Sequence, residues 1–207
     1  ASDVYKRQDM NIRINERAFK KIENNQVGPV IGKHIEKKII QGVNQAHREM
    51  LKEFESHPVT KEIESGPEGW NESGTLGGYG NLFSYIGFEE GMDPIAPIRS
   101  ILKKALNVKS IPSTQRSMIL KFQVELPSKE EIFSASPMPW VSGRSWAEGI
   151  ERGISGLGNY INRMTFSGRS GQGIQAKNKI RSGQFRNTKY LSNILNNLKK
   201  NISKSIK

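Results

Sequence analysis

The sequence predicts an α+β fold in which one long amphipathic helix and a second, shorter helix pack on a small antiparallel sheet. The first observation behind this prediction is an apolar stripe that keeps helical spacing for about six turns after Pro29. The second is the alternation of apolar and polar residues from Met118 to Leu126, which is typical of a strand. The third is a net positive charge confined to the end of the chain, which predicts a basic C-terminal arm and a helix whose apolar stripe packs either on the body or on a neighbouring subunit.

Two short features precede the long helix. Residues 3–8, DVYKRQ, look like the translation of an adapter used in sequencing libraries, so residues 1–9 are expected to be either such an artefact or a disordered leader. The predicted body then spans residues 10–136. It opens with an edge strand at Met10–Ile14, and Asn15 is expected to cap a brief helix through Ile22.

The long helix is predicted to begin near Pro29, which suits a first helical turn, and to end near Ser56. Pro58 sets the end, because proline disfavours helical geometry in the residue before it. Charged residues occupy the opposite face, as expected for a helix with one side in water. The buried stripe is predicted to consist of Ile31, Ile35, Ile39, Val43, Ala46, Met50 and Phe54.

No catalytic or metal-binding pattern stands out in the sequence. His34, His47 and His57 have no carboxylate or second histidine at ligand spacing, so we expect surface or half-buried histidines and no metal or other cofactor. The chain has no cysteine, which excludes disulfides and thiolate chemistry. Ser145 follows Gly143 and Arg144 but has no His or Asp partner nearby, so we expect no nucleophilic serine and no enzymatic activity.

The middle of the body contains a glycine-rich stretch between two apolar segments. Val59–Ile63 is predicted to be a short strand or turn, and residues 66–80 a loop. A phosphate-binding loop is the alternative for this stretch, but it lacks the Gly-Lys-Ser/Thr ending of that motif. Leu82–Phe88 is rich in aromatic and apolar residues, which predicts a buried strand.

The rest of the body is predicted to contain a helix, a strand and a short final helix. Asp93 and Pro94 together mark a helix start, since aspartate caps and proline fits the first turn. After the Met118–Leu126 strand, Ser128 and Glu131 match a capping box and predict a short helix. The buried stripe of the helix after Pro94 is expected to be Ile95, Ile98, Ile101, Leu102, Ala105 and Leu106.

Residues 137–163 combine tryptophans and glycines and are predicted to be a docking segment. Trp146, Ile150, Ile154, Leu157 and Ile161 would share one face of a helix, with a glycine stripe beside it that lets another backbone approach closely. A loop with a short helical turn is the alternative, and the tryptophans suit either a core or an interface. The residues expected to contact another subunit or partner are Trp140, Arg144, Trp146, Gly149, Gly153, Gly156 and Tyr160.

The formal net charge of +12 resides entirely in the last 56 residues. All 20 acidic residues lie at or before Glu151, and residues 164–207 form the predicted basic arm with a helix that Thr188 is expected to cap. Such an arm implies an anionic partner, either nucleic acid or the acidic face of a protein. The residues expected to bind it are Arg169, Lys177, Lys179, Arg181, Arg186 and Lys189. No apolar run approaches the ~20 residues that span a bilayer, so we expect no membrane partner. We also expect no small-molecule substrate.

Several segments of the chain resemble structural proteins of tailed bacteriophages, especially marine ones. The segments are HPVTKEIESGP (57–67) with GTLGGYGNLFSYIGF (74–88), DPIAPIRSILKKAL (93–106) and PMPWVSGRSWAEGIERGISGLGNYI (137–161). A fainter likeness extends to tail-completion and head–tail joining proteins, in which a long helix precedes a Pro-Val turn and a Gly-aromatic segment. Thr60–Ile63 departs from the Thr-Gly-x-Leu pattern of those proteins, and the basic arm is an addition.

This resemblance implies a virion structural protein without catalytic activity, which forms a ring-like homo-oligomer at the neck or tail and contacts neighbouring virion proteins. It implies location in the virion, and in the host cytoplasm during assembly. The alternative from the residues is a non-enzymatic nucleic-acid-binding protein, because Phe166, Phe185 and Tyr190 lie among the basic residues of the arm. DNA contact through the arm is also compatible with the virion role.

Overall fold

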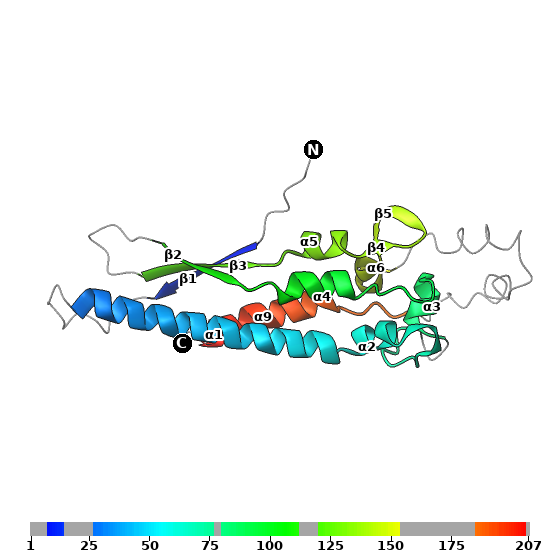
Figure 1. Cartoon of the computed structure of the whole chain (residues 1–207), viewed down its shortest axis with the longest axis horizontal. Helices are drawn as coiled ribbons and strands as arrows, with labels where there is room; N and C mark the ends of the chain where they lie inside the picture. Colours follow the sequence, from blue (N-terminus) through cyan, green and yellow to red (C-terminus); the bar gives the residue numbers. More distant parts are fainter. Residues whose placement is uncertain (1–7, 15–26, 77–79, 112–119, 154–184, 206–207) are drawn as a thin grey trace, which may run out of the picture. The chain divides into compact units, whose positions relative to one another are not determined.

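A computed structural model describes residues 8–14, 27–76, 80–111, 120–153 and 185–205 (Figure 1). The chain divides into two compact units, and the fold of each is an arrangement of helices with a small antiparallel sheet. Unit 1 comprises residues 1–53, 102–128 and 194–207, and unit 2 comprises residues 54–101 and 129–193. Three of the four boundaries fall within helices, namely α1 (Val27–Ser56), α4 (Ala96–Lys103) and α9 (Leu191–Ser205).

The sheet of unit 1 has three antiparallel strands in the order β1-β3-β2. They are β1 (Gln8–Ile14), β2 (Asn107–Ile111) and β3 (Leu120–Leu126), and Val124 in the centre pairs with Met10 on one side and Val108 on the other. Alternate residues of β3 are buried, as period-two patterning requires. The buried set is Phe122, Val124 and Leu126.

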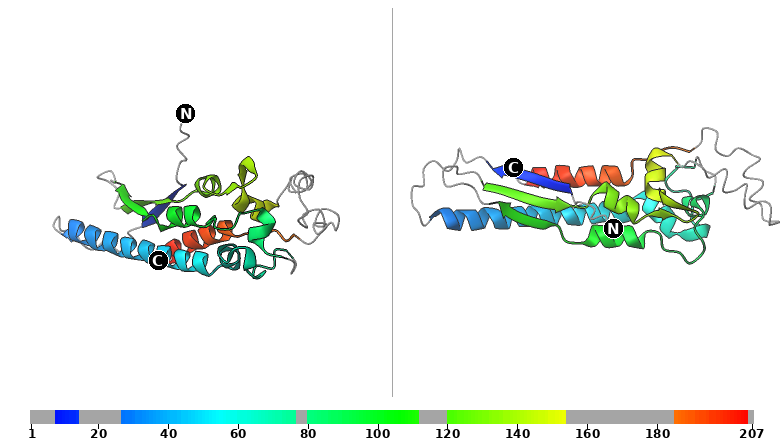
Figure 2. Two further views of the ribbon diagram at one scale, coloured as in Figure 1. Left: turned by 45° about the vertical axis from the view of Figure 1, so that its right-hand side comes forward. Right: turned by 90° about the horizontal axis from the view of Figure 1, so that it is seen from above.

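Helix α9 runs antiparallel to α1 within unit 1 (Figures 1 and 2). Asn197 donates a hydrogen bond to the Glu53 carboxylate over 2.7 Å, and Asn201 donates one to Glu49 over 3.2 Å. Gly42 allows the close approach at the end of α9, because a Cβ there would lie 2.6 Å from the hydroxyl oxygen of Ser205. The apolar stripes of the two helices supply the buried side chains Ile39, Val43, Ala46, Met50, Ile194, Leu195, Leu198 and Ile202.

Unit 2 consists of short helices and one hairpin. The helices are α2 (Pro58–Glu64), the 3₁₀ turn η1 (Gly66–Glu68), α3 (Leu82–Ile86), α5 (Lys129–Ser134) and α6 (Trp146–Arg152), and the hairpin joins β4 (Pro137–Met138) to β5 (Val141–Ser145). Its core combines the ends of α1, α4 and α9 with these elements. The largest fully buried side chains there are Trp146, Tyr190, Phe54, Phe83, Ile63, Leu82, Ile86, Ile95 and Ile98.

The predicted fold class is confirmed, and so are most of the long elements. The edge strand, the long helix ending at Ser56, the alternating strand and the helix after Ser128 all form. Asp93 caps α4 as predicted, since its carboxylate accepts hydrogen bonds from the backbone of Ile95 and Ala96. Strand β1 includes Gln8 and Asp9, which the sequence assigned to the leader. The brief helix expected after Asn15 lies outside the described residues.

Four local predictions are wrong. Val59–Ile63, predicted as a short strand or turn, belongs to helix α2, and the predicted strand Leu82–Phe88 contains helix α3. Thr188 does not cap the final helix, which begins at Leu191. Strand β2 was missed, because Asn107–Ile111 shows little alternation and has mostly exposed side chains. These segments are short, so their few apolar residues do not distinguish helix from strand.

Candidate functional site

The two tryptophans of the predicted docking segment hold the chain that follows α3. The indole nitrogen of Trp140 donates a hydrogen bond to the Ile86 carbonyl over 2.6 Å. Trp146 is 1% exposed and meets the ring of Phe88 edge-on, with centroids 6.0 Å apart. Trp146 therefore belongs to the core of unit 2, and the interface role expected from the sequence is not available to it.

The glycines of this segment serve the local fold. Gly149 is buried within α6, and its carbonyl accepts a 2.7 Å hydrogen bond from the Gly153 amide. Gly153 has a φ of +103°, so α6 ends before it and the predicted continuous helix does not pass this residue; Ile154, Leu157 and Ile161 lie outside the described residues. Ser145 begins α6 by accepting a hydrogen bond from the Glu148 amide.

The remaining predicted site residues are exposed where they are described. Arg144 lies exposed on β5, and Arg186 and Lys189 are exposed just before α9. The Arg186 amide donates a hydrogen bond to the Thr75 carbonyl, which attaches this segment to the glycine-rich loop. The structure does not describe Gly156, Tyr160, Arg169, Lys177, Lys179 or Arg181.

Two carboxylates that the sequence did not single out hold helix starts in unit 2. Glu62 is completely buried and accepts hydrogen bonds from the amides of Leu82 and Ser73, both over 2.8 Å. Glu151 accepts one from the amide of Ser192 over 2.6 Å and another from its hydroxyl. Each carboxylate thereby satisfies one amide in the first turn of a helix, Leu82 of α3 or Ser192 of α9, where negative charge is favoured. The hydrogen-bond partners of these carboxylates are distant in sequence, so no local sequence motif predicts the contacts.

A buried cluster surrounds Tyr190. Its hydroxyl bonds with that of Thr60, and its ring packs against Phe54 and His57, whose ring centroid is 4.6 Å away. Burial raises the pKa of Tyr190 far above its ordinary value of 10.0, although the Thr60 hydrogen bond opposes the shift. The phenol therefore stays protonated at neutral pH. Nδ1 of His57 accepts the Val59 amide at the start of α2, so this nitrogen caps a helix.

An ion-pair group lies beside this cluster in unit 2. The guanidinium of Arg99 donates two hydrogen bonds to the Glu55 carboxylate, over 2.8 and 2.9 Å, and a further one to Glu64. The pKa of Arg99 is raised, chiefly because the Glu55 hydrogen bonds favour its charged form. The bidentate geometry joins the end of α1 to α4 and α2, which is a structural use of these charges.

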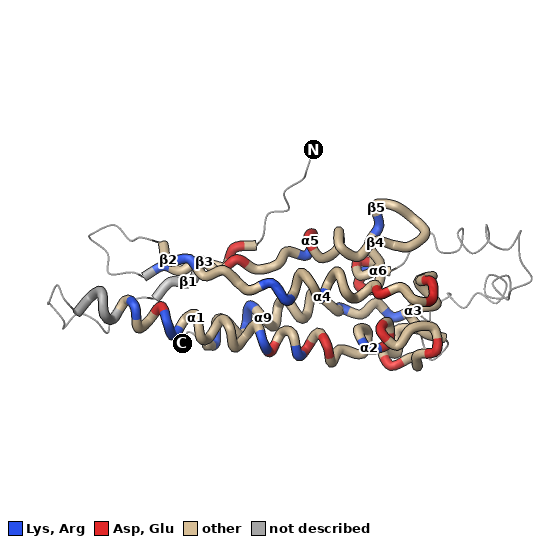
Figure 3. The backbone as a smooth tube through the Cα atoms, viewed as in Figure 1, with Lys and Arg blue, Asp and Glu red and all other residues tan. Residues whose placement is uncertain are grey.

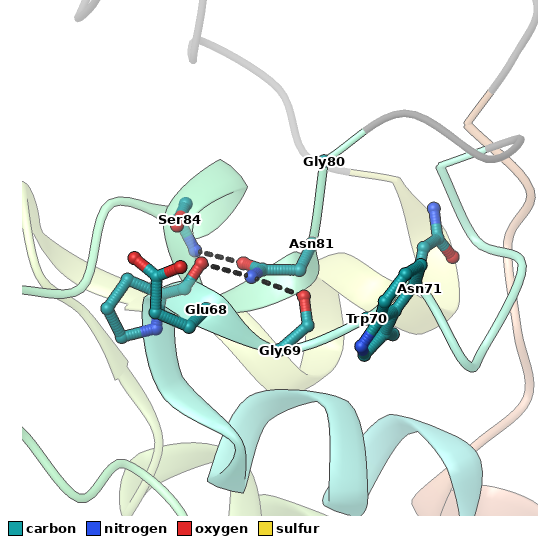
Figure 4. Close-up of a pocket in the computed structure, with 8 residues that line it drawn as sticks. Glu68, Gly69, Trp70, Asn71, Gly80, Asn81 and Ser84 are labelled. Carbon is teal, nitrogen blue, oxygen red and sulfur yellow. Dashed lines mark hydrogen bonds between the residues drawn. The ribbon is translucent and has the colours of Figure 1, made fainter.

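The most exposed apolar side chain of the described residues is Trp70, at 86%. It lies in the loop between η1 and α3 beside a hollow that Pro67, Glu68, Gly69, Asn71, Gly80, Asn81 and Ser84 also line (Figure 4). In the sequence, this tryptophan lies within a stretch whose Gly, Asn and Ser content predicts only a loop. A large aromatic among glycine, asparagine and glutamate is the signal that would have found it.

The loop around Trp70 is held by one carboxamide. The side-chain nitrogen of Asn81 donates hydrogen bonds to the carbonyls of Gly66, Pro67 and Gly69 over 2.7–3.1 Å. Its oxygen accepts the Ser84 amide over 2.9 Å and so caps α3 (Figure 4). The backbone on one side of Trp70 is therefore fixed while its indole remains exposed.

Within the described ranges, no group of three or more His, Asp or Glu side chains is placed to hold a metal ion. The helices among those residues are also too short or too polar to cross a membrane. Comparisons of the chain with protein-family models, with curated proteins and with solved structures give no match.

Proposed function

We propose that this protein is a structural component of a bacteriophage virion, a non-enzymatic subunit of a ring-like oligomer at the neck or tail. It joins head and tail through protein–protein contacts and acts in the virion after assembly in the host cytoplasm. The proposal starts from the resemblance of four sequence segments to phage structural proteins. One structural observation supports it.

The supporting observation is that the resembling segments fold together. Their described parts lie almost entirely in unit 2, although they span residues 57–153 of the chain. Glu62 of the first segment bonds to Leu82 of the second, and Trp140 of the last segment bonds to Ile86. The separate segments that resemble phage structural proteins are thus parts of one packed unit. This is expected if the resemblance reflects a shared domain.

The polar groups of unit 2 support a scaffold more than a reaction centre. Glu62, Asn81 and Glu151 direct their polar atoms to backbone amides and carbonyls, and His57 caps α2. Catalytic sites need a nucleophile or base aimed at a substrate position. Rigid turns that carry exposed loops are what a subunit needs for repeated docking.

Light scattering after size-exclusion chromatography, with negative-stain microscopy, tests the proposal. We expect a mass that is a multiple of the 23.3 kDa subunit, and ring-shaped particles. A protein that stays monomeric at all concentrations would contradict it.

DNA titration tests the alternative of nucleic-acid binding. Phosphate contacts predict affinity that falls steeply between about 50 and 200 mM salt. Replacing both Arg186 and Lys189, which are exposed, with glutamine should then lower the salt slope by about 2, since each phosphate contact contributes about 1. Such a result together with a monomeric protein would replace the virion role with the nucleic-acid role.

A further inference from the structure

The described residues of the two units carry opposite net charges. The described residues of unit 1 include 13 Lys or Arg and five Asp or Glu, a net charge of +8. Those of unit 2 include seven Lys or Arg and 12 Asp or Glu, a net charge of −5. Figure 3 shows acidic residues on α2 and in the loops around α3, basic residues on α9, and residues of both signs along α1. A neutral average over the first 151 residues conceals this separation.

The exposed tryptophan lies between two acidic residues of unit 2. Glu68 and Glu72 flank Trp70 two residues away on each side, and both side chains are exposed. Neither carboxylate has an ion-pair partner among the residues that the structure describes. An indole face attracts ammonium and guanidinium groups, and adjacent carboxylates strengthen this attraction. The surface made by Glu68, Trp70 and Glu72, here named the Trp70 loop, therefore suits a cationic protein surface.

Unit 1 presents such a surface on α1. Lys33 and Lys37 are exposed and one helical turn apart, and the described residues offer neither of them a hydrogen-bond or ion-pair partner. At 100° per residue they lie 240° and 200° around the helix from Ile39, whose side chain is buried. They therefore face away from the core of unit 1. Some other cations of this unit are already engaged, for example Lys109 with Glu125 and Lys199 with Gln8.

We propose that the Trp70 loop of one copy docks on the Lys33–Lys37 face of α1 in a second copy. This inference rests on the proposed oligomeric function and names its interface. The two surfaces differ, so the contact is head-to-tail: one copy keeps its Lys33–Lys37 face unused and the other keeps its Trp70 loop unused. Such a contact repeats until the rotation closes a ring, as a ring-forming subunit requires. Trp70 supplies the aromatic anchor, and the flanking charges set the partner and orientation.

A charge-swap experiment tests this contact. One variant carries Glu68→Lys and Glu72→Lys, and the other carries Lys33→Glu and Lys37→Glu. Each alone brings like charges together, so each should lose the oligomer in light scattering. A mixture should regain it, because copies that alternate restore opposite charges at every contact. Capture of one variant through an affinity tag on the other reports the mixed assembly directly.

Matched variants separate a specific contact from bulk charge. Lys200→Glu with Lys204→Glu changes the charge of unit 1 equally, on exposed α9 positions one turn apart, and should assemble like the wild type. Trp70→Ala should weaken association about 30-fold or more, as expected for a central aromatic anchor. Met92→Ala, which truncates another exposed apolar side chain of unit 2, should leave association unchanged. Melting temperatures near that of the wild type show that each variant is folded.

The outcomes distinguish this inference from the proposed function. A wild type that remains monomeric contradicts both. An oligomer that persists in Trp70→Ala and in both charge-reversed variants overturns the docking inference alone. A mixture that fails to assemble, or an equal loss in the α9 control, also overturns it. If Lys33→Glu with Lys37→Glu abolishes DNA binding but leaves the oligomer intact, this face binds nucleic acid and the inference is wrong.

Discussion

Glu62→Ala should destabilise unit 2 strongly. The side chain is 0% exposed, and its carboxylate accepts the amides of Leu82 and Ser73. A hydrogen bond to a charged group contributes about 1.5–3 kcal/mol, so losing both should lower the free energy of unfolding by about 3–6 kcal/mol. That is a large part of the ~5–15 kcal/mol by which a typical domain is stable. Glu62→Gln keeps one acceptor oxygen and should lose about half as much.

Urea unfolding followed by tryptophan fluorescence measures the effect, since Trp140 and Trp146 report on unit 2. With a slope of about 2 kcal/mol/M, Glu62→Ala should lower the midpoint by about 1.5–3 M. Glu90→Ala is the matched control, because that carboxylate is exposed in the same unit, and its midpoint should not move. Equal midpoints for the two variants would refute the assignment of Glu62 as the residue that holds α3 to α2.

Two further predictions concern Tyr190 and the end of α3. Tyr190 keeps its proton in the folded chain but releases it near pH 10 when unfolded, so stability is intact below pH 10 and falls above it by up to about 1.4 kcal/mol per pH unit. Tyr190→Phe should remove this component, and parallel stability curves for the two proteins above pH 10 would contradict the burial argument. Gly87→Ala should lower stability by about 1–2 kcal/mol, because φ is +91° at this helix end. Gly32→Ala, inside α1 with open space around it, should raise stability by up to about 1 kcal/mol. A melting temperature that falls in both variants would contradict the view that only Gly87 needs glycine for its backbone conformation.

The long elements of this protein follow from local patterns. Ile39, Val43, Ala46 and Met50 repeat at helical spacing, and burying that stripe outweighs any competing local preference. Pro58 predicted the end of α1 for a steric reason that holds in any context. The alternating residues of β3 likewise required a strand with one buried face.

The short helix α3 shows why the other elements were missed. Leu82–Phe88 has the composition of a buried strand, yet Asn81 caps a helix there and Gly87 ends it in the left-handed region. A helix of five residues is too short to be stable from its own hydrogen bonds. The carboxylate of Glu62, 20 residues earlier in the chain, supplies the partner that the first amide needs. Composition carries no record of such a partner.

Some properties of the candidate interface follow from the sequence, and others depend on the tertiary structure. Sequence order alone established the charge at the end of the chain, the absence of cysteine and the apolar faces of the long helices. Folding determined that Trp146 is buried while Trp70 is exposed, although both lie among glycines and charged residues. It also divided the charges that balance along residues 1–151, so that the part within unit 1 is net basic and the part within unit 2 is net acidic. Exposure and charge separation depend on which distant segments pack together, and that is a property of the tertiary contacts and not of any local stretch of sequence.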